Sequence, residues 1–178
     1  ASPKKTPKCC VNLPDGFQQT GASLSADGTT LYIVADKATP SVVYALNTSN
    51  GSTRWSYTLD AASNSIPAVD NLGQIHLCTK TGAYVVLSAE GEHRYKENQA
   101  DSVDGSPTIS EWGYSYFLGK DSAAGALKVY SVALPGVTSP AASAWSQYGQ
   151  NARHSFYQKY PNVEFRRGGG PQGRPAFR

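Results

Sequence analysis

Short hydrophobic runs with polar residues at alternate positions recur along the middle of the chain. Alternation with a period of two is typical of β-strands, because successive side chains of a strand point to opposite faces of a sheet. Three such runs each follow a glycine-containing turn and precede a second run of the same kind. The first runs are Leu31–Val34, Ile75–Cys78 and Tyr114–Leu118, and the second are Val42–Leu46, Ala83–Leu87 and Leu127–Val132. The pattern predicts paired β-strands.

The predicted strands belong to a repeat of about forty residues. Gly51 and Gly91 are forty residues apart, and so are Trp55 and Tyr95, and Pro67 and Pro107. A unit reads strand, glycine turn, strand, loop, strand, glycine turn, strand. This is a four-stranded antiparallel meander, the size of one β-propeller blade. We therefore predict an all-β fold with about three such blades.

Composition and charge agree with a strand-rich protein. The chain has 11 Tyr and 3 Trp, no Met, and 17 Gly with 11 Pro, so aromatic strand residues and turn residues dominate. The net charge of +3 comes from the two ends, where Lys4 and Lys5, and Arg166 and Arg167, lie. No aromatic residues alternate with these basic residues, so we predict solvated tails and not nucleic-acid binding. No apolar stretch is long enough to predict a membrane span.

The segment Ala45-x-Asn47-x-x-Asn50-Gly51-x-x-x-Trp55 resembles the tryptophan-docking motif of quinoprotein-like (PQQ-type) β-propellers. The resemblance implies that Trp55, on the outermost strand of one blade, packs against the turn of the next motif. The second copy keeps Gly91 but has Val85 for the alanine and Tyr95 for the tryptophan. The segment around Trp145 resembles one that begins or ends such propellers. The residues that the resemblance assigns to blade docking are Ala45, Gly51, Trp55, Gly91, Tyr95 and Trp145.

The repeat divides the chain into three parts. Residues 1–19 form a lead-in, residues 20–158 carry the blades, and residues 159–178 form a basic, Gly/Pro-rich tail that we predict to be flexible. Propellers close with about four to eight blades, so three do not complete a ring. We therefore expect a partial propeller, completed by further blades of the same protein, by another protein chain or by a second copy.

The three cysteines are candidates for disulfide bonds. Cys9 and Cys10 are adjacent, and a vicinal disulfide of that kind lies against the cofactor in quinoprotein alcohol dehydrogenases. Alternatively, one of the two could bridge to Cys78 and the other to a neighbouring chain. Cys78 also fits a small buried hydrophobic residue on a strand. Asn47 and Asn50 begin N-glycosylation sequons in the same turn, although blade docking would use that turn too.

No set of residues in the sequence predicts catalysis. His76, His93 and His154 are scattered without metal-ligand spacing, and no nucleophile elbow or phosphate-binding glycine loop is present. We predict no catalytic, metal or cofactor site. The function expected first is a non-enzymatic propeller for protein binding, adhesion or envelope scaffolding. The alternatives are a fragment of a quinone-cofactor (PQQ) dehydrogenase and a subunit of an extracellular filament. The turn-rich composition and the Ala1-Ser2-Pro3 start fit a secreted, extracellular or periplasmic protein.

Overall fold

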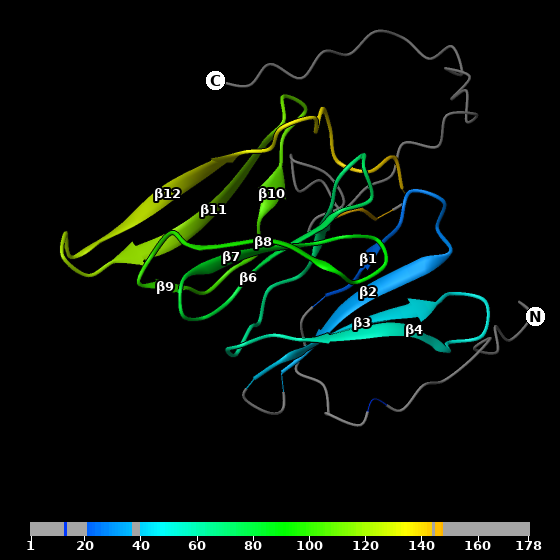
Figure 1. Cartoon of the computed structure of the whole chain (residues 1–178). Helices are drawn as coiled ribbons and strands as arrows, with labels where there is room; N and C mark the ends of the chain where they lie inside the picture. Colours follow the sequence, from blue (N-terminus) through cyan, green and yellow to red (C-terminus); the bar gives the residue numbers. More distant parts are fainter. Residues whose placement is uncertain (1–12, 14–20, 37–39, 144, 148–178) are drawn as a thin grey trace, which may run out of the picture.

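The computed structural model describes Leu13 and residues 21–36, 40–143 and 145–147, and Figure 1 shows their arrangement. These residues form twelve β-strands in three antiparallel sheets, with no helix among them. The expectation of an all-β fold with four-stranded antiparallel sheets is confirmed. Most of the predicted lead-in, the predicted tail, and also Cys9, Cys10 and His154 lie outside the described residues.

The first two sheets are meanders in which each strand pairs with the next along the chain. We call the three sheets blades 1, 2 and 3. Blade 1 comprises β1 (Ser23–Leu24), β2 (Thr30–Ala35), β3 (Val42–Asn47) and β4 (Thr53–Thr58). Blade 2 comprises β5 (Ala68–Val69), β6 (Ile75–Cys78), β7 (Ala83–Leu87) and β8 (His93–Asn98). Their central strands are rich in β-branched and aromatic residues, which fit a packed pleated surface.

Blade 3 has the same number of strands in a different order. It comprises β9 (Ser102–Val103), β10 (Thr108–Ile109), β11 (Tyr114–Asp121) and β12 (Ala126–Ala133). Both β9 and β10 pair with β11, and β12 pairs with its other edge. No described strand pairs with the outer edge of β12. After β12 the chain turns through Pro135 and reaches Pro140, and prolines cannot donate to a strand ladder.

The segment that follows blade 3 runs along the inner strands of all three blades. The N–H of Leu24 on β1 donates to Trp145 O (2.6 Å), and the N–H of Val69 on β5 donates to Ser146 O (2.7 Å). The N–H of Ile109 on β10 donates to the side-chain oxygen of Gln147 (2.8 Å). Residues 139–143 and 145–147 therefore pair with the inner strands of the three sheets.

Most of the core lies in two layers between neighbouring blades, and a third, smaller cluster lies on the other face of blade 1. Blade 2 contributes to both layers, because alternate residues of β6 and β7 point to opposite faces and every one of them is buried. Ile75, Leu77 and Val85 pack toward blade 1. Cys78 and Tyr84 pack toward blade 3. The stacking of sheets face to face explains why β6 and β7 are almost entirely apolar.

Candidate functional site

Trp55 fills the junction between blades 1 and 2. It lies on β4, opposite Ala45 on β3. Its indole N–H donates to Ala89 O in the turn of blade 2 (2.8 Å). The ring covers Gly91, where a Cβ atom would lie 2.6 Å from Trp55 Cδ2. A residue with a side chain at position 91 would displace the indole, so the turn requires glycine both for this contact and for its positive φ of 86°.

Tyr95 stands at the corresponding position between blades 2 and 3. It lies on β8 opposite Val86, as Trp55 lies opposite Ala45. The residue that corresponds to Ala45 is therefore Val86 and not Val85, because the turn of blade 2 is one residue shorter than that of blade 1. Tyr95 is 39 % exposed, and its hydroxyl donates to the Glu97 carboxylate. The two junctions thus differ in how far they are filled.

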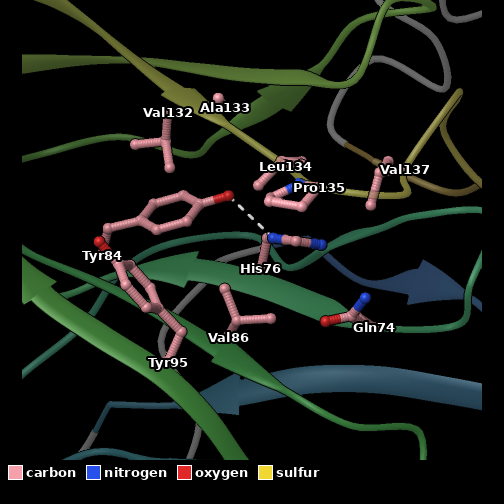
Figure 2. Close-up of a pocket in the computed structure, with 10 residues that line it drawn as sticks. All are labelled: Gln74, His76, Tyr84, Val86, Tyr95, Val132, Ala133, Leu134, Pro135 and Val137. Atoms are coloured by element: carbon pink, nitrogen blue, oxygen red, sulfur yellow. Dashed lines mark hydrogen bonds between the residues drawn. The ribbon is translucent and has the colours of Figure 1, made fainter.

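A cavity of about 300 Å³ lies at the second junction (Figure 2). Tyr95 forms part of its wall on blade 2, and the turn that follows β12 faces it from blade 3. The lining residues are Gln74, His76, Tyr84, Val86, Tyr95, Val132, Ala133, Leu134, Pro135 and Val137. Most of these side chains are apolar, and the deepest polar groups belong to His76 and Tyr84, both of which are buried.

His76 and Tyr84 belong to a buried hydrogen-bonded triad with Asp70. Asp70 Oδ2 lies 2.9 Å from His76 Nε2, and His76 Nδ1 lies 2.8 Å from the Tyr84 hydroxyl. Both ring nitrogens of His76 are therefore paired, one with a carboxylate and the other with a hydroxyl. Burial raises the pKa of Tyr84 well above its ordinary value. The phenol therefore remains protonated and fixed in place at neutral pH.

Asp70 also organises the turn between β5 and β6. Its Oδ1 accepts the backbone N–H groups of Leu72 and Gln74, both at 2.8 Å. In blade 3 the hydroxyl of Ser110, forty residues later, accepts the corresponding N–H groups of Trp112 and Tyr114. An aspartate in place of the serine performs the same turn function and retains a second oxygen for His76.

The sequence does not show directly that these three residues meet. Neither Asp70 nor Tyr84 lies at a spacing from His76 that suggests a metal or catalytic motif. The structural signal is diagonal across two strands: His76 on β6 pairs with Val86, and Tyr84 lies two residues before Val86 on β7. The replacement of Ser110 by Asp70 within the repeat was the one sequence feature that could have indicated the triad.

The remaining predicted site residues lie in turns, on strands or at the inner edge. Gly51 has a positive φ of 75° in the turn after β3. Asn47 Oδ1 and Asn50 Oδ1 accept the backbone N–H groups of Ser49 and Ser52, so both predicted glycosylation acceptors are also turn-forming side chains. Trp145 lies in the segment that crosses the inner strands. N-glycosylation at either asparagine stays a prediction.

Cys78 is buried on β6 and is a free cysteine in the described part of the chain. Burial raises the pKa of its thiol well above the ordinary range, so it is protonated and unreactive at neutral pH. Its surroundings match the small buried hydrophobic residue that the sequence allowed. Its candidate partners, Cys9 and Cys10, lie outside the described residues.

Two features of the described residues bear on the class of site. They contain no group of three His, Cys, Asp or Glu side chains that could hold a metal ion. They also contain no helix of the length and hydrophobicity that a membrane span requires. The cavity at the second junction combines a mostly apolar lining with the buried triad, and it is our candidate site for small ligands.

The chain is similar to known proteins in its structure. No protein-family model matches the chain, and no curated protein matches it by sequence. Among solved structures, the chain is similar to BamB from Moraxella catarrhalis, with a TM-score of 0.52 and 14 % identity over 68 % of this chain and 34 % of that one. It is also similar to a luciferin-regenerating enzyme, with a TM-score of 0.51 and 15 % identity over 67 % of this chain and 46 % of that one.

Both of these structures are β-propellers. The described chain has the fold of a partial β-propeller. It spans about a third of the length of BamB and less than half that of the luciferin-regenerating enzyme. At these identities the likeness shows the fold alone.

Proposed function

We propose that this chain is a non-enzymatic propeller module whose third blade binds further blades or another protein chain. The observation that carries the proposal is the outer face of blade 3. We define this face by the side chains of Tyr114, Tyr116 and Leu118 on β11 and of Leu127 and Val129 on β12. All five are exposed, with Leu127 at 76 % and Val129 at 70 %.

The two faces of blade 3 differ sharply. Along β11, buried and exposed residues alternate, and the buried set includes Phe117, which stacks on Tyr84 of blade 2 with 5.5 Å between ring centroids. The opposite face carries large apolar side chains without a layer to cover them. In blade 2 the corresponding face is buried against its neighbour. An apolar sheet face of this kind marks an interaction site.

The edge of blade 3 supports the same proposal. In blades 1 and 2, a fourth strand pairs with the outer edge of the third one. In the described part of the chain, the eight-residue strand β12 has no such partner. Unpaired strand edges recruit other strands through backbone hydrogen bonds. A partner that covers the face of blade 3 could therefore also extend its sheet.

We further propose where this module acts and to which propellers it is related. The turn-rich composition supports a role outside the cytoplasm, in adhesion or in scaffolding of the cell envelope. The Trp55 junction supports a relationship to the quinoprotein-like propellers. A quinone-cofactor dehydrogenase fragment is the second candidate, and it is motivated by the adjacent Cys9 and Cys10 and by the docking motif around Trp55. An extracellular filament would use the same open face between copies of the chain.

A charge-insertion experiment tests the proposal. We expect the double variant Leu118→Lys, Val129→Lys to remain folded, because both side chains point to solvent. We also expect it to bind the native partner at least tenfold more weakly than the wild type does. The matched control is Ser56→Lys on the exposed side of β4. Complexes purified from the source cells would be compared by mass photometry.

The two candidate functions give different results in that experiment. Equal recovery of complexes with the double variant and with the control would contradict the proposed binding face. Quinone absorbance in the purified complex, together with calcium-dependent reduction of a dye, would favour the dehydrogenase instead.

A further inference from the structure

The strongest unassigned feature is the difference between the two blade junctions. At the first junction, the indole of Trp55 fills the space above the turn of blade 2 and covers Gly91. At the second junction lies the smaller ring of Tyr95, whose hydroxyl donates a hydrogen bond to the Glu97 carboxylate. Gly136 is the turn glycine of blade 3. A Cβ atom added at this position would lie 3.8 Å from Leu72 Cδ1, its nearest neighbour. The second junction thus has a cavity of about 300 Å³ beside Tyr95, whereas the hollow of about 750 Å³ beside Trp55 at the first junction is more open to solvent.

We infer that the cavity between blades 2 and 3 binds a small neutral aromatic molecule, which occupies the space that an indole fills at the first junction. The volume of about 300 Å³ lies at the lower end of the range of small-molecule pockets. It suits a ligand of one or two fused rings.

The lining selects for a neutral ring. Val86 of blade 2 and Val132, Leu134 and Val137 of blade 3 provide apolar walls. Among the described residues that line the cavity, none is an Asp, Glu, Lys or Arg. A charged ligand would lose its hydration without gaining an ionic partner, and this loss is unfavourable. An uncharged ring loses little on entering such a site and gains contact area.

Aromatic and polar groups define how such a ring would lie. The ring of Tyr95, which is 39 % exposed, lines the cavity and offers a face or an edge for stacking (Figure 2). The amide of Gln74 at the rim can accept a hydrogen bond from a ring N–H or O–H group. These contacts favour an indole-like or phenol-like ligand over an aliphatic one of the same size.

The site is also rigid. The Asp70–His76–Tyr84 triad fixes the two polar side chains at its floor, and all three residues are buried. Rigid sites bind with a smaller loss of conformational entropy. The triad therefore supports a preformed pocket, and its buried polar groups are already paired in the absence of any ligand.

Indole is the probe that tests this inference. We expect saturable binding to the intact chain with a dissociation constant of roughly 0.1–1 mM, the range expected for so small a ligand, measured by ligand-observed NMR and titration calorimetry. Tyr95→Trp should fill the cavity and weaken binding at least tenfold. The matched control is Tyr116→Trp, because Tyr116 is equally exposed, at 38 %, but lies on the outer face of blade 3.

Two further arms make the test decisive. Val132→Phe fills the cavity from blade 3 and should weaken binding in the same way, which covers the case in which Tyr95→Trp does not fold. Indole-3-acetate should bind at least tenfold more weakly than indole because of its charge. Absence of saturable indole binding, or equal binding by wild type and both filled variants, would overturn the inference without affecting the proposed role of blade 3. Equal binding of indole-3-acetate would overturn its neutral-ligand part.

Discussion

Replacing Trp55 with alanine is expected to lower the free energy of unfolding by about 3 kcal/mol. Truncation of a large buried aromatic side chain costs about 3–5 kcal/mol, and the partial exposure of this ring places it at the lower end. The variant loses the contact with Gly91 and the hydrogen bond to Ala89 O. It also loses the packing against the tilted ring of Tyr32, whose centroid lies 5.9 Å from that of the indole. Urea-induced unfolding followed by circular dichroism measures the change.

The chain provides a matched control for this variant. Trp112 lies in the turn between β10 and β11 and is 82 % exposed. Trp112→Ala removes the same side chain from solvent and should change stability by less than about 0.5 kcal/mol. A loss below about 1 kcal/mol for Trp55→Ala, or equal losses for the two variants, would mean that Trp55 does not hold blades 1 and 2 together.

Replacing Asp70 with alanine is expected to cost about 3–5 kcal/mol, which is typical of removing one partner from a buried charged network. The substitution leaves two turn N–H groups and the Nε2–H of His76 without an acceptor. All of these groups lie next to the inner strands of the propeller, where Asp70 also forms a β-bridge with Pro140. Chemical denaturation measures the loss.

A serine at position 70 separates the two functions of the aspartate. Asp70→Ser retains an acceptor for the turn, as Ser110 does in blade 3, and leaves only Nε2 of His76 unpaired. Its loss should be smaller, about 1–3 kcal/mol, the cost of a buried group without a partner. Equal losses for Asp70→Ser and Asp70→Ala would mean that the turn bonds contribute nothing. A loss near zero for Asp70→Ala would contradict the buried triad.

The sequence predicts the strands of this fold well because two periods are superimposed in it. Alternation along each strand and the forty-residue repeat place β2, β3, β6 and β7 close to their observed bounds. The glycines and Pro67 mark the connections between them. These signals are local, so they can be read without knowledge of which sheets are neighbours.

The features that the sequence does not predict depend on contacts between residues that lie far apart in the sequence. One residue fewer in the turn of blade 2 shifts the partner of Tyr95 from Val85 to Val86, and only pairing reveals this shift. The path of residues 139–143 and 145–147 along the inner strands depends on backbone hydrogen bonds, which leave no signature in the sequence.

The triad and the cavity are difficult to predict from the sequence for a related reason. Asp70, His76 and Tyr84 meet across a hairpin, and their spacing matches no known motif. The cavity lies between side chains of two blades, from Gln74 to Tyr95 on one and from Val132 to Val137 on the other. Its presence depends on the distance between two sheets, which no local pattern encodes.

Hydrogen–deuterium exchange on β12 tests whether blade 3 has an unpaired edge and an exposed face that a partner covers. In the isolated chain, peptides that cover Ala126–Ala133 should exchange much faster than those of β6 and β7, because exposed strand edges are weakly protected. In the native assembly the same peptides should become protected. Unchanged rapid exchange of β12 in the assembly, or strong protection in the isolated monomer, would contradict the account.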